Sequence, residues 1–481
     1  MKLSKIGKIL IIVGGLGAIF FLAFQYAFLT DFPIGHDAGH HVAVAINVEK
    51  GGFFNFSNYK SILYPIPLTL FALFHKITQL AWPQLFLYTI CFFLFLTATA
   101  WAYFTTRATD KWEIGIIAGI FLVSSRWLSD ALRIGFFAEA WGWFVFVLGS
   151  YFLVKRKFWP LTFSMILLFF SHPLVLMVFL LILIIYLVII MVFEPKKEDK
   201  FFIYQIISLL FLAFASVLAF YPEKIHEFLK ISQFAYLEGA RSLKNIMIDS
   251  DKRRILIYLL AIPGIIKGIQ LWKRNEIKFL FILLFVSIIL SQLYLWGINF
   301  WVFRFYPYLE MAFAAFAAIG LYYLVELLPS FIQKNKIIRL LILGFLVVLL
   351  IFPNFDVNKK ITLWQKNNYQ ILAICPPADR EAFEWVKNNL SSHSRFIAPT
   401  KWGSWLRPLG NVEVIEWDDI FAPSNNYGWL LSMIEYYNID YIYFSSIQVE
   451  NPQVEKNQKI FEPIYQKDGA RIYYVRRNEI P

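Results

Sequence analysis

The sequence predicts a polytopic α-helical membrane protein that ends in one small α/β domain. Of the 481 residues, 59% are hydrophobic and only 16% are charged, whereas a soluble domain is normally about half apolar and about a quarter charged. The apolar residues gather in blocks of roughly 18 to 22 residues, the length of a helix that crosses the ~30 Å hydrocarbon core of a bilayer. Aromatic residues make up 19% of the chain, and they suit both the lipid-facing surface and the headgroup level.

The formal charge of +12 does not indicate a nucleic-acid partner. The basic residues fall mostly in short runs between apolar blocks, which is the pattern of cytoplasmic loops in membrane proteins. The two cysteines are far apart in the sequence: Cys91 lies inside an apolar block and Cys375 lies in the terminal domain. We therefore expect no internal disulfide.

The first expected element is a retained signal anchor. Lys2 and Lys5 precede an apolar stretch of about 20 residues with no small-residue cleavage site after it, so the N-terminus is expected in the cytoplasm. Placing the short basic loops on the same side gives about eleven crossings. The expected spans are residues 8–29, 83–105, 112–128, 138–154, 158–171, 173–193, 201–221, 254–271, 278–296, 304–327 and 338–353.

These spans make residues 1–353 a transmembrane bundle. One apolar segment, 62–80, breaks the alternation of sides and carries Pro65 and Pro67 near its start, so we interpret it as interfacial or re-entrant. The outward segments are 30–61, 129–138, 221–253 and 297–303. The third of these is long and basic, which suits either an anionic lipid phosphate or an ordinary solvated loop.

Residues 354–481 have an ordinary composition, and we expect them to form a small extracytoplasmic α/β domain. Helical and strand patterns alternate there, and Asp468-Gly469 is a turn signal inside a hairpin over 460–475. The other expected elements are a helix at 378–390, a strand at 395–399, a Trp-rich loop or short helix at 401–409, a strand at 412–416, a helix at 428–437 and a strand at 441–445.

The most unusual stretch is Gly35–His41, which holds Asp37 among His36, His40 and His41. It opens an amphipathic helix, 40–49, that ends at two glycines. An acid at a membrane surface is a functional candidate, so Asp37 could be a general base or could bind Mg²⁺ or Mn²⁺ together with the histidines. The alternative is that Asp37 is a helix N-cap and the histidines are solvated. The residues alone leave both hypotheses open.

Several short motifs resemble the GT-C superfamily of glycosyltransferases, including its bacterial and archaeal members of unassigned function. The motifs are an acid soon after the first span, an amphipathic helix ending in two glycines, and the stretches 64–67 (YPIP), 133–139 (RIGFFAE), 171–173 (SHP), 303–310 (FRFYPYLE) and 382–386 (AFEWV). The resemblance covers nearly the whole chain as a pattern. It implies a GT-C-like bundle, a polyprenyl-phosphate sugar as donor and an exported C-terminal domain.

The resemblance also implies residue roles. Asp37 would activate the acceptor, and Arg304 would contact the donor phosphate, whose geometry a guanidinium matches. Tyr64, Arg133 and His172 lie in the other matching motifs and are the further candidates for substrate binding. The first-loop acid of better-known members is often part of an acidic pair, whereas His36 precedes Asp37 in this sequence, so the metal requirement stays open.

Glu139 is the second candidate for a catalytic residue. It begins an apolar span, where burial is costly unless the side chain faces a cavity or a partner, and Arg133 is the partner we consider. The alternative is that a helix N-terminus simply favours an anion there. His172 lines the same cavity or is a structural histidine, and Arg304 is either the phosphate ligand or an interfacial residue whose charge reaches the headgroups.

The favoured function is a membrane glycosyltransferase that moves a hexose or pentose from a polyprenyl-phosphate donor to a glycan, lipid or protein acceptor on the outer face. The chemistry needs a base near the acceptor hydroxyl and positive charge for the departing phosphate. The alternatives are a transporter or flippase of an anionic lipid or glycan, and a non-catalytic protein of cell-surface glycan assembly. In each case the chain lies in the cell membrane and contacts membrane lipids.

Overall fold

The computed structural model divides into two compact units. The first unit is Met1–Tyr26, Cys91–Ser129 and Ala138–Val357, and the second is Ala27–Ile90, Asp130–Phe137 and Asn358–Pro481. The residues described are 5–25, 27–28, 30, 32–33, 37–51, 65–125, 128, 137–193, 200–208, 254–293, 302–329, 335–351, 375–416, 427–446 and 452–480.

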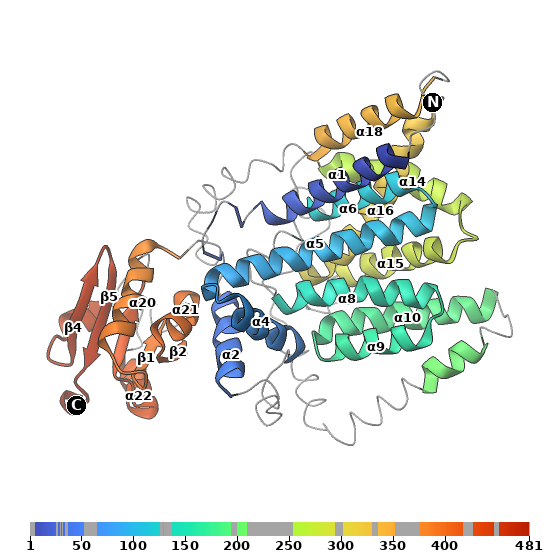
Figure 1. Ribbon diagram of the computed structural model, residues 1–481. Helices are drawn as coiled ribbons and strands as arrows, with labels where there is room; N and C mark the ends of the chain where they lie inside the picture. The colour runs from blue at the N-terminus through green and yellow to red at the C-terminus, as the bar shows by residue number, and fades with distance from the viewer. Residues whose placement is uncertain are drawn as a thin grey trace. The chain divides into compact units, whose positions relative to one another are not determined.

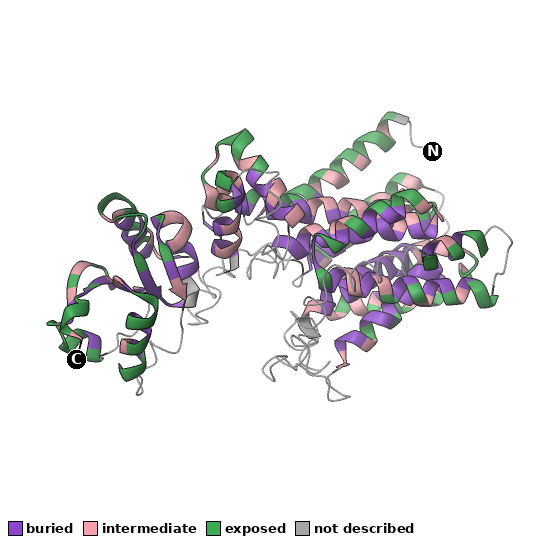
Figure 2. Ribbon diagram, turned by 90° about the horizontal axis from the view of Figure 1, so that it is seen from below, coloured by how far each residue is buried: buried purple, intermediate pink, exposed green. Residues whose placement is uncertain are grey.

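Helices make up the described part of the first unit, where they lie side by side as a bundle (Figure 1). Buried residues run through the middle of this bundle, and exposed ones lie on its outside (Figure 2). The helices are α1 (Lys5–Phe24), most of α5 (Trp82–Thr109), α6 (Trp112–Val123), α8 (Phe137–Val154), α9 (Phe158–Phe169), α10 (Pro173–Phe193), α14 (Arg254–Gln270), α15 (Asn275–Ser291), α16 (Tyr306–Glu326) and α18 (Lys336–Ile351).

Five of the described helices are long and apolar enough to cross a membrane: α1, α5, α8, α10 and α16. Their bounds agree with five of the expected spans, and the prediction of a polytopic α-helical protein is confirmed. The expected count of about eleven crossings is not confirmed. Two of the remaining expected spans, 112–128 and 158–171, are helices of only 12 residues, α6 and α9. Residues 209–253, with most of the span expected at 201–221, lie outside the described residues.

Large apolar side chains cover the outer surface of the bundle. Trp159 and Phe163 on α9 are 77% and 62% exposed, and Phe193 at the end of α10 is 75% exposed. Contiguous exposed apolar surface of this kind is rare on a soluble monomer and is normal where side chains meet lipid. The burial pattern therefore agrees with the helix lengths in placing this unit in a membrane.

Glycines bring α14 and α16 into backbone contact. A Cβ atom added to Gly320 of α16 would lie 1.9 Å from the carbonyl oxygen of Leu260, and one added to Gly264 of α14 would lie 1.7 Å from that of Phe316. Small residues at such a seam let membrane helices pack closely, because no side chain separates the backbones. The close contact fixes α16 against α14 along the middle of both helices.

The C-terminal part of the second unit contains a five-stranded sheet in the order β2-β1-β3-β5-β4. β1 pairs in parallel with β2 and β3, while β5 pairs antiparallel with β3 and β4. Asp468 and Gly469 turn the last hairpin with φ values of 47° and 90°, the positive values that a two-residue hairpin turn requires. The strands are β1 (Arg395–Ala398), β2 (Glu413–Glu416), β3 (Tyr441–Phe444), β4 (Phe461–Lys467) and β5 (Ala470–Val475).

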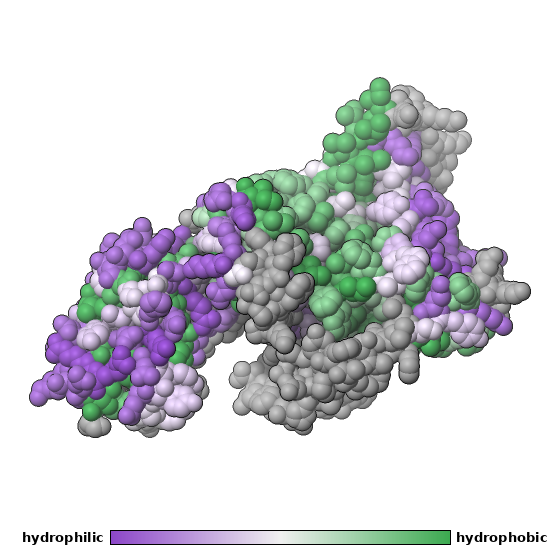
Figure 3. All heavy atoms as spheres, turned by 60° about the horizontal axis from the view of Figure 1, so that its bottom comes forward, coloured by the Kyte–Doolittle hydropathy of each residue, from purple (hydrophilic) through white to green (hydrophobic). Residues whose placement is uncertain are grey.

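The expected helices and strands of this α/β domain are present, and the Trp-rich segment is a helix rather than a loop. The surface of this region is largely hydrophilic (Figure 3). Beneath it, Asp379 is fully buried and accepts hydrogen bonds from Tyr443 Oη, Ser445 Oγ, Ser446 Oγ and the Ser446 backbone amide. The helices are α20 (Pro377–Asn389), α21 (Thr400–Gly410), α22 (Tyr427–Tyr437) and α23 (Pro452–Lys456).

Two helices from the N-terminal part of the chain belong to the same unit as this sheet. They are α2 (Asp37–Gly51) and α4 (Pro65–Thr78), which pack on each other. The 14 residues of α4 rise about 21 Å, which is less than the ~30 Å needed to cross a bilayer. The helix is not among the candidate spans of the described chain, and an interfacial or re-entrant segment at 62–80 stays a prediction.

Candidate functional site

Three polar side chains meet where three helices of the bundle begin. Glu139 lies in the first turn of α8, His172 immediately precedes α10, and Arg304 lies in the 3-10 helix η3 (Val302–Phe305) that leads into α16. Arg304 donates a hydrogen bond from Nη1 to Glu139 Oε1 over 2.5 Å. His172 Nε2 lies 3.2 Å from the same oxygen. We call these three residues the helix-start cluster.

The members of the helix-start cluster are buried to different depths. The side chains of Glu139 and His172 are 3% and 6% exposed, while that of Arg304 is 18% exposed. Burying an unpaired carboxylate costs several kcal/mol, so the guanidinium of Arg304 is what stabilises an ionised Glu139 at this position. The N-terminal end of α8 adds a further ~0.3–1 kcal/mol through the helix dipole. Arg304 is the most accessible member and is therefore the best placed to meet a ligand.

Aromatic packing holds the cluster in position. Tyr308, in the first turn of α16, is 1% exposed, and its ring lies edge-on to Phe146 with 5.1 Å between ring centroids. Trp141 donates a hydrogen bond from Nε1 to Ser171 Oγ over 2.9 Å, next to His172 in the sequence. The charged side chains therefore lie at helix ends, and contacts with neighbouring helices hold these ends in place. A site held in this way is positioned more precisely than a site on a loop.

The structure gives Glu139 different partners from those expected. Arg133, the partner considered from the sequence, lies outside the described residues, as does Tyr64. Glu139 instead contacts Arg304 and His172, which the sequence indicated only as separate candidates. One feature of the sequence could have indicated this contact. Each of the three residues lies at the start of a predicted span, and the three starts are on the same predicted side of the membrane.

The first-loop helix α2 begins at Asp37, three residues earlier than the expected start at residue 40. His36 and the side chain of Asp37 lie outside the described residues. Within the second unit, α2 packs against α21: a Cβ atom on Gly39 would lie 2.5 Å from the backbone of Ser404. The close approach explains a glycine between Asp37 and His40, because any side chain there would push the two helices apart.

The two described histidines of the His36–His41 segment have separate surroundings. His40 Nε2 lies 3.0 Å from Glu416 Oε2 on β2. The ring of His41 lies 5.9 Å from that of Phe137 and 6.3 Å from that of Phe86, measured between centroids. Successive helix residues point about 100° apart, which separates the two rings. In the part of the chain that the structure describes, no group of three or more His, Cys, Asp or Glu residues is arranged to hold a metal.

Two further contacts in this unit have no counterpart in the sequence analysis. His75 Nδ1 of α4 lies 2.8 Å from Glu49 Oε2 of α2, and the His75 ring stacks on Trp82 with 3.7 Å between centroids. Glu416 likewise was not a candidate before its contact with His40. These residues lie apart in the sequence and carry no motif, so nothing in the sequence pattern indicated the contacts.

No family model matches the chain, and no curated protein matches it. Solved structures do match the chain. ArnT from Cupriavidus metallidurans bound to undecaprenyl phosphate superposes with a TM-score of 0.58 at 10% identity, over 98% of each chain. The same protein in its apo state gives a TM-score of 0.59 at 10% identity and the same coverage. Arabinofuranosyltransferase AftD from Mycobacteria gives 0.57 at 12% identity, over 96% of this chain but 41% of AftD.

These likenesses show the fold. They extend over nearly the whole length of this chain, so they include both the helical bundle and the C-terminal sheet. The chain therefore has an ArnT-like fold, and this fold agrees with the polytopic bundle that the resemblance of its short motifs implied.

Proposed function

We propose that the protein is a membrane glycosyltransferase that transfers a sugar from a polyprenyl-phosphate-linked donor to an acceptor on the outer face. The observation that carries the proposal is the helix-start cluster, which presents a guanidinium at the beginning of α16 in a GT-C fold. A departing lipid phosphate needs positive charge as its own charge develops, and a preorganised guanidinium supplies it. The structure of ArnT with undecaprenyl phosphate supports a lipid phosphate as the ligand of such a fold.

Arg304 is the proposed ligand of the donor phosphate. Its planar fork matches phosphate oxygens better than the point charge of a lysine does. Glu139 acts in this proposal as a positioning residue, because its carboxylate fixes the guanidinium at Nη1. His172 holds the same carboxylate oxygen from the other helix start. The sequence made Glu139 a candidate for a catalytic residue, and in this proposal it orients Arg304.

Asp37 is the proposed base that takes the proton of the acceptor hydroxyl. General-base catalysis contributes typically 10²–10⁴-fold, and Asp37 is the first residue of α2. Tyr64 and Arg133 are proposed to line the substrate site. A hexose or a pentose fits the proposal, and so does a glycan, a lipid or a protein as acceptor.

A divalent cation is a separate part of the proposal. His36 and the side chain of Asp37 lie outside the described residues, and no step of the reaction is assigned to a metal. A requirement for Mg²⁺ or Mn²⁺ is tested by removing divalent ions with EDTA and adding each ion back. Loss and recovery of transfer would place the ion in the reaction. Undiminished transfer in EDTA would remove it.

The proposal requires the acceptor site to face outward, with the N-terminus in the cytoplasm and residues 354–481 outside. The basic short loops support this orientation. Reporter enzymes fused after Pro481 test it: a periplasmic-type reporter should be active and a cytoplasmic one inactive. The opposite pattern would reverse the membrane orientation and remove the outer-face acceptor.

Purified protein incubated with a panel of labelled polyprenyl-phosphate sugars and cell-envelope acceptors tests the proposed function. We expect transfer from at least one donor, a loss of roughly 10²-fold or more in Asp37→Asn, and normal transfer in Arg107→Ala, an exposed arginine of α5. Movement of lipid across vesicles without transfer would instead identify a flippase. Binding of glycans without either activity would identify an assembly protein.

A further inference from the structure

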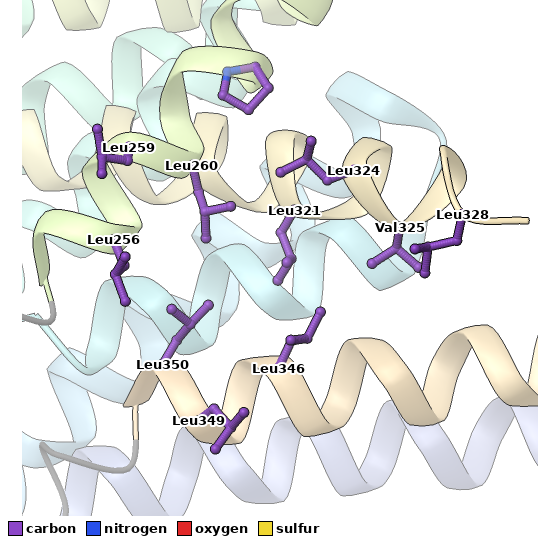
Figure 4. Close-up of a pocket in the computed structure, with 11 residues that line it drawn as sticks. Leu256, Leu259, Leu260, Leu321, Leu324, Val325, Leu328, Leu346, Leu349 and Leu350 are labelled. Carbon is purple, nitrogen blue, oxygen red and sulfur yellow. The ribbon is translucent and has the colours of Figure 1, made fainter.

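An apolar groove lies on the side of the bundle between α14, α16 and α18 (Figure 4). Its volume is about 690 Å³, and every lining residue is Leu, Val or Pro. Leu259 of α14, Leu324 of α16 and Leu349 of α18 line it and are 52%, 41% and 54% exposed. The groove is therefore open toward the surroundings of the bundle, which in a membrane are acyl chains.

One end of the groove is marked by cations. Val325 and Leu328 line the groove at the end of α16, and Glu326 lies between them. Lys111 Nζ lies 2.8 Å from Glu326 Oε1, and Arg339 Nη1 of α18 lies 3.6 Å from the same oxygen. Two cations thus converge on one carboxylate.

Two tyrosine rings and a third cation also lie at this end of the groove. The Lys111 ammonium lies 4.2 Å from the ring centroid of Tyr322, and the Arg339 guanidinium lies 5.2 Å from it. Lys267 of α14 lies 4.4 Å from the ring centroid of Tyr323 and makes its hydrogen bond to Gln270. None of the ion pairs among the described residues includes Lys267, so the positive charge here exceeds the negative charge.

The cationic end and the apolar groove lie along one face of α18. Arg339, Leu346 and Leu350 are separated by seven and four residues, the spacing of one helix face. At 1.5 Å per residue, Leu346 and Leu350 lie about 10 and 16 Å along the helix from Arg339. An amphiphile with its head at Arg339 would therefore run its chain directly between the leucines.

We propose that this groove binds an anionic phospholipid from the leaflet that touches the basic ends of the helices. Its phosphate meets Arg339, Lys111 and Lys267, and an acyl chain occupies the space between α16 and α18. Basic pockets between membrane helices recognise anionic headgroups in this way. The net positive charge argues against a second copy of the chain, which would bring the same charge to the interface.

This site is distinct from the proposed donor site. Arg304 precedes the first residue of α16 and Glu326 is its last, and the 21 residues between these ends span about 31 Å. The two phosphate sites thus stand in opposite leaflets. The lipid site does not depend on the proposed glycosyltransferase activity.

Native mass spectrometry of the detergent-purified protein tests the proposal. The chain is titrated with phosphatidylglycerol or with phosphatidylcholine of identical acyl composition. We expect phosphatidylglycerol to bind about 10-fold more tightly, a difference of about 1.4 kcal/mol. Lys267→Gln and Arg339→Gln should each reduce this preference at least about threefold, and Leu349→Trp, which narrows the groove, should weaken both lipids.

Two variants, one immediately before α9 and one on it, serve as matched controls. Lys157→Gln removes an exposed positive charge, and Phe163→Trp enlarges an exposed apolar side chain away from the groove. Both should bind lipid as the unmodified protein does. The proposal would be overturned by equal binding of the two lipids or by equal losses of binding in the controls. It would also be overturned by a dimer mass that disappears in Leu349→Trp, or by displacement of phosphatidylglycerol by polyprenyl phosphate in Arg304→Ala. Lys267 is in none of the ion pairs among the described residues, so we expect Lys267→Gln to fold, and thermal unfolding of the variant checks this.

Discussion

Replacing Gly320 by alanine should separate α14 from α16. The new Cβ would lie 1.9 Å from the Leu260 carbonyl oxygen and 2.9 Å from the Gly264 backbone nitrogen. Both contacts are to backbone atoms, so no side-chain rotation relieves them. Restoring an ordinary contact of about 3.4 Å requires the two helices to move apart by roughly 1.5 Å, and this opens the seam along its length.

The expected cost follows from two opposing effects. Overpacking of a tight interior typically costs ~1–3 kcal/mol, while the change from glycine to alanine in a helix gains up to ~1 kcal/mol. We therefore expect Gly320→Ala to lose about 1–2 kcal/mol of stability net and Gly320→Leu to lose more. A loss of this size lowers Tm by about 2–4 °C per kcal/mol in a protein of 150–250 residues, and by less in a longer chain.

The assay is thermal unfolding of the detergent-purified protein followed by intrinsic tryptophan fluorescence. Gly344→Ala on α18 is the matched control, because a Cβ atom there has nothing within 4 Å. Its Tm should be unchanged or slightly raised by the helix propensity of alanine. A Gly320→Ala protein as stable as Gly344→Ala would refute the inference of close backbone contact between α14 and α16.

Three further predictions concern the helix-start cluster and the C-terminal domain. Arg304→Lys should use the donor less well than the unmodified protein, and Arg304→Ala should be worse, because lysine keeps the charge but loses the planar fork; donor titrations check this. Glu139→Gln should raise the KM for the donor with a smaller change in kcat, since it removes the charge that orients Arg304, and normal donor kinetics would dismiss the positioning role. In the C-terminal domain, Tyr443→Phe should cost about 1.5–3 kcal/mol by removing a hydrogen bond to the Asp379 carboxylate, measured by chemical denaturation. Burial raises the pKa of Tyr443 well above 10. Its contribution to the free energy of unfolding is therefore complete below the pKa of unfolded tyrosine, near 10, and is lost as pH rises beyond that value. Tyr443→Phe should lack this loss of stability at alkaline pH.

Local chemistry explains which parts of the fold could be predicted. Asp468 and Gly469 specify a turn with two positive φ angles, and the structure has that turn. The span expected at 173–193 coincides with α10 because apolar residues fill it completely and Pro173 marks its start. Such elements are determined by residues close together in the sequence, so they can be predicted from the sequence alone.

Tertiary packing explains what could not be predicted. Arg304 and Glu139 are 165 residues apart, and each has an adequate explanation alone, as an interfacial cation and as an anion at a helix start. Their contact depends on how α8, α10 and α16 pack. The same holds for Gly39, whose role becomes clear only because α21, more than 350 residues later, lies against α2.

Helix α16 connects the separate conclusions about the bundle. Arg304 at its start is fixed by Glu139, Gly320 in its length contacts α14 through the backbone, and Glu326 at its end binds Lys111 and Arg339. A helix held at three levels behaves as a rigid support, so a change at one level shifts the others. Gly320→Ala should therefore weaken donor use as well as thermal stability, whereas Glu139→Gln should weaken donor use far more than its effect on Tm would account for. This difference separates a residue that positions the guanidinium from one that merely packs the helix beneath it.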